Sequence, residues 1–218
     1  TIRSVIFLTN DKLGRFNLFE ICLASLLWIS CGSSQTLDQN MGHQSPDYNI
    51  NETKAIDRLS QSLQHKTVSL EDTSEINYEA YDRFLHFLEE KYPNTHENIE
   101  RERFGQYSLL YKWEGSKSGL KPAMMIGHYD VVPVKYNDDT LWRYPPFSGE
   151  VEDGFVWGRG ALDDKSGVMS IMEAVEYLTE QGFQPERTFY IALHHDEEVG
   201  GVRGAQQIAE YLDEQDIE

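Results

Sequence analysis

The chain has very few cysteines. Its 218 residues include two, Cys22 and Cys31, and both precede the part of the sequence that has a globular composition. A disulfide within that part is therefore excluded, and so is a cysteine nucleophile. The sequence also lacks a Gly-x-Ser-x-Gly motif, which leaves no candidate for a serine nucleophile on a strand-to-helix elbow.

Positive charge is scarce. The chain has 19 Lys and Arg against 37 Asp and Glu, which gives a net charge of −18. Such a charge repels phosphate backbones and anionic lipids, so we expect no nucleic acid partner and no electrostatic binding to a membrane surface. The hydrophobic residues, 39% of the chain, and the aromatic residues, 12%, suffice for a packed core in one or two small domains.

The N-terminal segment differs from the rest of the chain. Residues 16–30 are mostly apolar, contain one glutamate and follow two basic residues. This run is too short and interrupted for a membrane span, but it is typical of a signal peptide. Around Cys31 the sequence resembles a bacterial lipoprotein cleavage site, although Trp28 stands where a leucine is usual. We therefore predict a signal peptide or lipoprotein-type segment at 1–35 and a polar tether at 36–51.

The N-terminal segment at 1–35 is also the basis for predicting where the protein is located. It predicts a secreted protein, or a lipoprotein anchored on the periplasmic or extracellular side of a membrane. Contact with the membrane would come only through the N-terminal lipid anchor.

From residue 52 onward the sequence shows alternating helical and strand-like patterns. Apolar residues on one helical face predict helices over 56–63, 81–92, 165–181 and 202–212, and short apolar runs predict strands over 107–113, 123–126, 155–157 and 188–193. The run at 123–126 predicts a short buried strand that leads to His128, and the run at 188–193 is continuous, as in a central strand buried on both faces. These patterns are typical of an α/β protein.

Three polar clusters follow the strand-like runs in the last third of the chain. They are Gly-His-Tyr-Asp-Val-Val-Pro at 127–133, Gly-Arg-Gly-Ala-Leu-Asp-Asp-Lys at 158–165 and Asp-Glu-Glu-Val-Gly-Gly at 196–201. Imidazole and carboxylate groups are the ligands that suit zinc or a similar divalent ion. An α/β protein places its chemistry at such strand ends, so these clusters are the candidate site.

Spacing within the clusters suggests how the side chains cooperate. His128 and Asp130 lie two residues apart, so on an extended chain they share a face and the carboxylate can accept the second ring N–H of the imidazole. Glu197 and Glu198 are adjacent, so on an extended chain they point opposite ways. One glutamate can then hold a metal while the other faces the substrate water.

The three clusters, in this order, resemble the M20 family of metallopeptidases from about residue 50 to the end of the chain. The resemblance implies a three-layer, zinc-exopeptidase-like catalytic domain over 52–218, with a mostly parallel central sheet flanked by helices. It also implies that His128 ligates one zinc ion, that Asp163 bridges two, and that Glu198 ligates the other.

The remaining roles follow from the same resemblance. Glu197 would be the general base, Asp130 would orient His128, and two Zn²⁺ ions would occupy the complete active site. The implied reaction is hydrolysis of a peptide bond or of the amide bond of an N-acyl amino acid, with a small peptide or an N-acyl amino acid as substrate. The peptide bond from Asp163 to Asp164 is expected to be cis.

Neighbouring polar residues need other roles. A carboxylate just ahead of a helix is commonly an N-cap, and we assign the cap to Asp164 or Ser166 and keep Asp163 for the metal. His194 and His195 are expected to be hydrogen-bonded supports rather than metal ligands.

In the family pattern a further acidic ligand, a lid domain and a last histidine follow the Glu-Glu pair. We expect them beyond Glu218, so the chain is interpreted as the N-terminal part of the catalytic domain, truncated before the lid domain and inactive by itself. Two alternatives stay open. One is another di-zinc aminopeptidase family, against which the lysine after the Asp pair is an argument, and the other is a non-catalytic fragment that lacks the downstream ligands.

Overall fold

The computed structural model of the chain describes residues 5–7, 48–134 and 142–217. The predicted leader and tether lie outside these residues apart from 5–7 and 48–51, and both cysteines lie outside them. The signal peptide, the lipid anchor and the secreted location therefore stay predictions. None of the helices in the described ranges is both long enough and apolar enough to cross a membrane.

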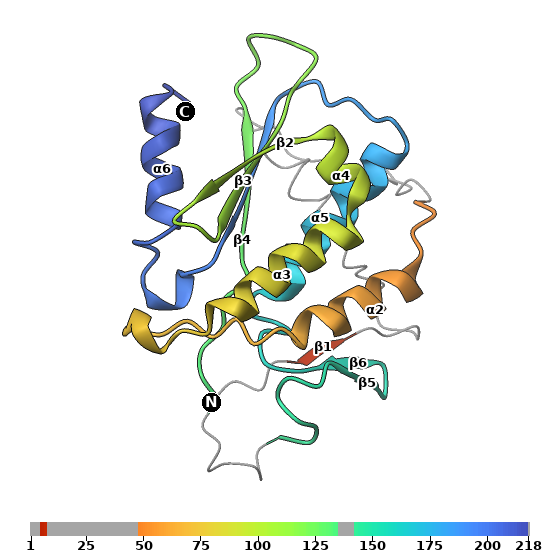
Figure 1. The fold of residues 1–218 in the computed structure, drawn as a ribbon. Helices are drawn as coiled ribbons and strands as arrows, with labels where there is room; N and C mark the ends of the chain where they lie inside the picture. Colours follow the sequence, from red (N-terminus) through yellow and green to blue (C-terminus); the bar gives the residue numbers. More distant parts are fainter. Residues whose placement is uncertain (1–4, 8–47, 135–141, 218) are drawn as a thin grey trace, which may run out of the picture.

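The described elements form a four-stranded main sheet with helices on both faces (Figure 1). Helices α3 and α5 pack on one face, α2 and α4 contact α5, and α6 covers part of the other face. The elements are β1 (Val5–Phe7), α2 (Glu52–Leu63), η1 (Thr73–Glu75), α3 (Tyr78–Lys91), α4 (Pro93–Asn98), β2 (Glu100–Phe104), β3 (Ser108–Trp113), β4 (Ala123–His128), β5 (Glu150–Glu152), β6 (Phe155–Trp157), α5 (Lys165–Glu180), β7 (Phe189–His194), η3 (Glu197–Val199) and α6 (Ala205–Glu214). The predicted α/β class with flanking helices is confirmed.

The strand directions differ from the expectation of a mostly parallel sheet. In the order β2, β3, β7, β4, only the pair of β4 and β7 is parallel, because β3 is antiparallel to both of its neighbours. A loop of three residues joins β2 to β3, and within it Gly105 and Gln106 have positive φ. A hairpin this tight can connect only antiparallel strands, whereas the crossover through α5 makes β4 and β7 parallel.

Apolar periodicity accounts for the core helices. Helix α3 buries one stripe of side chains and ends at Lys91, shortly before Pro93, as predicted. Helix α5 buries a second stripe. The two stripes are Tyr81, Phe84, Leu85 and Leu88 in α3 and Val168, Ile171, Met172 and Val175 in α5. The helices predicted at the positions of α2, α3, α5 and α6 are all present.

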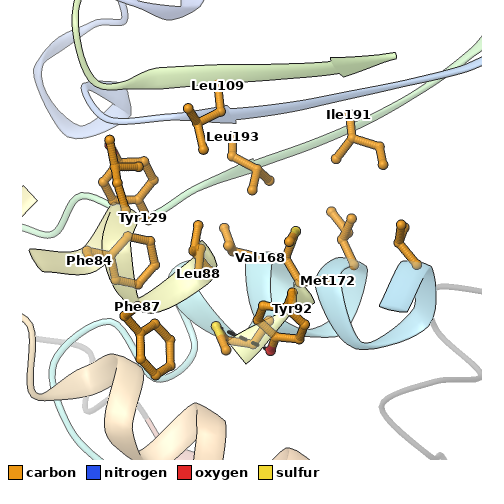
Figure 2. Close-up of a cluster of buried hydrophobic side chains, with 14 of the residues drawn as sticks. Phe84, Phe87, Leu88, Tyr92, Leu109, Tyr129, Val168, Met172, Ile191 and Leu193 are labelled. Atoms are coloured by element: carbon orange, nitrogen blue, oxygen red, sulfur yellow. Dashed lines mark hydrogen bonds between the residues drawn. The ribbon is translucent and has the colours of Figure 1, made fainter. Parts of the chain in front are cut away.

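The main core lies between the sheet and helices α3 and α5 (Figure 2). Ile191 and Leu193 project from β7 toward α5, where Val168 belongs to the same cluster. Phe84 of α3 stacks on Tyr129, with ring centroids 4.6 Å apart. Because Tyr129 follows the last residue of β4, this packing holds the chain where it leaves the sheet.

Strand β7 is the central strand that its continuous apolar run predicts. Its residues from Tyr190 to His194 are buried, and β3 and β4 pair with its two edges. On the face away from α3, Ile208 and Leu212 of α6 pack against Ala192. Burial on both faces explains why no polar alternation interrupts this strand.

Strand β4 is less buried than its sequence predicts. Met124 is 37% exposed and Ile126 is 60% exposed, so the expectation of a buried strand at 123–126 is wrong for these two side chains. Strand β4 is an edge of the described sheet, and these side chains line an open groove that α6 borders. A separate small sheet, in the order β1, β6, β5, lies beside α2.

Candidate metal centre

Three segments bring polar side chains together at one edge of the main sheet. His128 is the last residue of β4, Asp163 lies in the turn before α5, and Glu197 and Glu198 belong to η3, just after β7. Strands β4 and β7 are parallel, with His128 opposite His194, so their ends meet at the same edge. The metal ligands and the general base proposed from the sequence thus lie in one cluster.

The donor atoms of this cluster are close together. His128 Nε2 lies 3.0 Å from Asp163 Oδ1 and 3.8 Å from Glu197 Oε2. One ligand atom from each of His128, Glu197 and Glu198 also lies within 4.8 Å of the others. The sequence interpretation gave Glu197 the role of base alone, whereas the structure places its carboxylate among the groups that surround the imidazole.

Asp130 is fully buried behind this cluster and contacts four groups. Its Oδ1 accepts a hydrogen bond from the main-chain N–H of Glu197 at 3.1 Å and lies 3.3 Å from His128 Nδ1. Its Oδ2 accepts from the main-chain N–H of Glu198 at 3.1 Å and from the Ser69 hydroxyl at 2.7 Å. Asp130 therefore lies beside His128 as predicted, but the hydrogen bond expected at His128 Nδ1 is not formed in this structure. Asp130 also binds the main chain of both glutamates.

The hydrogen bonds explain why Asp130 stays ionised in a buried position. Burial alone would raise the pKa of Asp130. Its contacts with His128, Ser69 and the main-chain N–H of Glu198 outweigh burial, so the pKa lies below its usual value. Sequence reasoning missed Ser69, which lies in a polar loop that no motif marks. Only its contact with Asp130, 61 residues away in the chain, reveals it.

Negative charge is concentrated around His128. Burial lowers the pKa of the His128 imidazole, but the Asp130 carboxylate and the other carboxylates nearby outweigh burial and raise that pKa to about 9. Burial and the charge of Asp163 raise the pKa of Glu198. The neighbouring carboxylates contribute to both shifts, and a bound cation would relieve that contribution. An imidazole nitrogen among carboxylate oxygens is a donor set of zinc sites, so these residues fit a zinc ion.

The local conformation of the glutamate pair differs from the prediction. Glu197 and Glu198 lie in the 3₁₀ turn η3 rather than on an extended chain, and the turn ends at Gly200 in the left-handed conformation, with φ of 91°. The two carboxylates therefore do not point to opposite sides, and both reach the neighbourhood of His128. They still differ in exposure, since Glu197 is exposed and Glu198 is half-buried.

The turn before α5 contains the cis peptide bond expected between Asp163 and Asp164. Asp163 is largely exposed and faces His128 Nε2. Asp164 occupies the N-cap position of α5 but makes no capping hydrogen bond with its side chain. Its Oδ2 instead accepts from the main-chain N–H of His128 at 3.4 Å, and its carboxylate lies where any side chain at Gly167 would be, 2.2 Å from an added Cβ.

The two histidines after β7 lie behind the cluster. His195 is buried and its Nδ1 is 2.7 Å from the Ser108 hydroxyl, as expected of a hydrogen-bonded support. His194 does not meet the same expectation at Nδ1, which is buried and has no hydrogen-bond partner among the described residues. Its ring is nearly parallel to the His128 ring, with centroids 6.1 Å apart. Among the described residues, neither histidine belongs to the group of side chains that could hold a metal ion.

Known proteins resemble this chain both in sequence and in fold. Residues 124–218 match the sequence profile of "Peptidase family M20/M25/M40". The chain is 40% identical to the probable carboxypeptidase S-like 2 of Dictyostelium discoideum, over 95% of this chain and 42% of that protein. It is also 40% identical to the N-fatty-acyl-amino acid synthase/hydrolase PM20D1 of Xenopus tropicalis, over 74% of this chain and 31% of that protein. The chain thus spans less than half the length of these curated relatives.

Solved structures of low sequence identity share the fold. The M20 family metallo-carboxypeptidase Sso-CP2 from Sulfolobus solfataricus superposes with a TM-score of 0.57 at 20% identity, over 75% of this chain and 35% of that chain. The dipeptidase Dug1p from Saccharomyces cerevisiae gives a TM-score of 0.56 at 21% identity over the same shares of the two chains.

Proposed function

The chain belongs to peptidase family M20/M25/M40, and we propose that the protein is a zinc-dependent hydrolase of peptide bonds or of the amide bonds of N-acyl amino acids. The observation that carries this proposal is the convergence of one imidazole and three carboxylates at the end of two parallel strands. The names of the relatives support a small peptide or an N-acyl amino acid as substrate. The family match favours this function over that of another di-zinc aminopeptidase family.

In this proposal His128, Asp163 and Glu198 would hold zinc, with two Zn²⁺ ions in the complete active site. When bound, zinc supplies Lewis-acid polarisation of the scissile carbonyl. Asp130 keeps the His128 imidazole in one orientation through the contact at Nδ1, which leaves Nε2 directed at Asp163. The same carboxylate fixes the main chain of the glutamate turn, so one buried residue sets the positions of several functional groups.

Glu197 is the proposed general base. Its carboxylate is exposed to the solvent side of the cluster, whereas Glu198 is half-buried, and this difference supports giving the two residues different roles. Glu197 would take a proton from the attacking water and return it to the leaving nitrogen. No covalent intermediate is required.

The proposal is tested by comparing Glu197→Gln with Glu198→Ala in the protein expressed from its complete gene. Glu197→Gln should keep bound zinc and lose most turnover, because an amide cannot accept the proton, whereas Glu198→Ala should lose zinc as well. Zinc is measured by elemental analysis after dialysis, and turnover is measured with dipeptides and N-acyl amino acids. Glu180→Gln, an exposed change at the end of α5, is the matched control. Full activity in zinc-loaded Glu197→Gln would refute the assignment of the base.

A further inference from the structure

Lys165, the first residue of α5, is buried in an unusual way. Its side chain has no exposed surface, and its Nζ donates hydrogen bonds to the main-chain oxygens of Ser62 at 2.9 Å and of His65 at 2.6 Å. These oxygens lie at the C-terminal end of α2, about 100 residues earlier in the chain. Nζ also lies 5.0 Å from the centroid of the Phe84 ring. Two carbonyl oxygens and the face of one aromatic ring therefore surround the amine.

The end of α2 does not require this lysine. The Ser62 oxygen also accepts from the His65 N–H at 3.3 Å, and the His65 oxygen accepts from the Thr67 N–H at 2.9 Å. Neither carbonyl would be left without a partner if Lys165 were apolar. Burying an amine among apolar groups is unfavourable compared with burying a hydrocarbon of the same shape. A methionine would fill the space, so the packing of α2 alone does not account for Lys165.

The turn that carries Asp163 closes around Lys165. The main-chain N–H of Lys165 donates to the Gly160 oxygen at 3.0 Å, so the two ends of the turn meet at this residue. Gly160 has φ of 79°, and a Cβ at that position would lie 2.5 Å from Val131 Cγ1 and 3.6 Å from Lys165 Cδ. The turn thus packs directly against Val131 and the aliphatic part of the Lys165 side chain, which leaves no room for a side chain at Gly160.

The position of Asp163 depends on these contacts of the turn with Val131 and Lys165. Its side chain is 69% exposed, and within the described part of the chain its polar contact is with His128 Nε2, at 3.0 Å. A largely exposed side chain with one contact does not fix its own main chain. The position of the carboxylate must then come from the turn, and the turn is anchored through Lys165 to α2 and α3.

We propose that Lys165 is a positioning residue for the metal centre, which anchors the turn of residues 160–165 to the end of α2 and so holds the Asp163 carboxylate at His128. The inference rests on the proposed function, because it assigns Asp163 to the metal. Lys165 itself touches neither substrate nor metal in this role. It acts through Asp163.

The test compares Lys165→Met with Arg58→Met in the protein expressed from its complete gene. Arg58 also joins α2 to α5, since it is buried and its Nη1 lies 3.0 Å from both carboxylate oxygens of Glu173. Glu173 lies about 12 Å along α5 from Lys165. Both substitutions remove a long basic side chain that joins the same two helices, but only Lys165 is next to the turn that carries Asp163.

Zinc affinity, measured by competition with a chelator, is the readout that separates the two variants. We expect Lys165→Met to weaken zinc binding about 10- to 100-fold, as changes next to metal ligands do, and Arg58→Met to bind zinc like the wild type even where its melting temperature falls. Excess zinc should restore part of the lost kcat/KM in Lys165→Met. Wild-type zinc affinity in Lys165→Met, or an equal loss in Arg58→Met, would overturn the inference.

Two further outcomes are decisive. If Lys165→Met is insoluble, Lys165→Arg carries the test, because a planar guanidinium cannot occupy the same space without moving the turn or Phe84, and wild-type zinc affinity in that variant would overturn the inference. A wild-type protein that binds no zinc would instead refute the proposed function, and this inference with it.

Discussion

Asp130→Asn is the substitution that tests the architecture of the site most directly. The change keeps the shape of the side chain and replaces one carboxylate oxygen with an amide NH₂. Each oxygen of Asp130 faces two groups, Oδ1 facing His128 Nδ1 and the N–H of Glu197, and Oδ2 facing the N–H of Glu198 and the Ser69 hydroxyl. Whichever way the amide turns, its NH₂ meets at least one main-chain N–H in a fully buried position.

The magnitude follows from the less costly orientation. With the NH₂ at the Oδ2 position, the Ser69 hydroxyl can rotate to accept a hydrogen bond, but the N–H of Glu198 loses its partner. A lost hydrogen bond to a charged group, together with a buried donor left unpaired, costs about 2–4 kcal/mol. The main chain of Glu198 should also shift, and the negative charge beside His128 is gone. We therefore expect zinc affinity and turnover to fall about 10- to 100-fold.

Urea denaturation and zinc titration measure the two effects on the same samples. Ser69→Ala is the graded control, because it removes one hydroxyl donor and leaves the charge and both main-chain bonds of Asp130 in place. It should cost about 1 kcal/mol and change zinc affinity much less. If Asp130→Asn unfolded within about 0.5 kcal/mol of the wild type and bound zinc equally well, the central role given to this carboxylate would be wrong.

Two further predictions concern stability away from the metal ligands. Burial, aided by nearby basic groups, lowers the pKa of His65 from 6.5 to about 4. The unfolded chain therefore takes up a proton that the folded protein does not, and the free energy of unfolding should fall as pH drops from 6.5 toward 4. Between pH 7 and pH 5 the wild type should lose about 1 kcal/mol more than His65→Gln in urea denaturation, and parallel pH profiles would contradict this. Glu176 accepts hydrogen bonds from the main chain and side chains of Asn94 and Thr95 at the start of α4, so Glu176→Ala should destabilise the protein by about 2–4 kcal/mol. The exposed control Glu180→Ala should stay within about 0.5 kcal/mol of the wild type, and equal effects of the two changes would refute the capping role.

Elements with a buried apolar stripe could be predicted from the sequence, and elements held by tertiary contacts could not. Helices α3 and α5 bury one face, and that burial requires the spacing that the sequence shows. Strand β2 reads Glu-Arg-Glu-Arg-Phe and has no apolar alternation, because it is an edge strand with mostly exposed or half-exposed side chains. It is held by the ladder with β3 and by an ion pair of 2.7 Å between Arg101 and Glu89. Neither contact leaves a local pattern.

In the candidate site, too, some residues could be predicted from the sequence and others could not. His128, Asp163 and the Glu-Glu pair could be found because few residue types can bind a divalent cation, and they occur in recognisable clusters. Ser69 and the buried amine of Lys165 could not be found, because a loop serine and the first residue of a helix are ordinary in sequence. Their contacts, with Asp130 and with the end of α2, exist only after folding.

The register of β4 against β7 connects the core to the site. His128 pairs with His194, and the N–H of Tyr129 donates to the His194 oxygen at 3.0 Å, which carries the pairing one step beyond the strand. This register places Asp130 beside the N–H groups of the turn that follows β7. A slip of β4 by one residue would turn His128 to the opposite face of the sheet and would also bring Met125 and Tyr129 out of the core. Because the buried apolar side chains disfavour that slip strongly, the packing of the core also determines the distance between the imidazole and the glutamates.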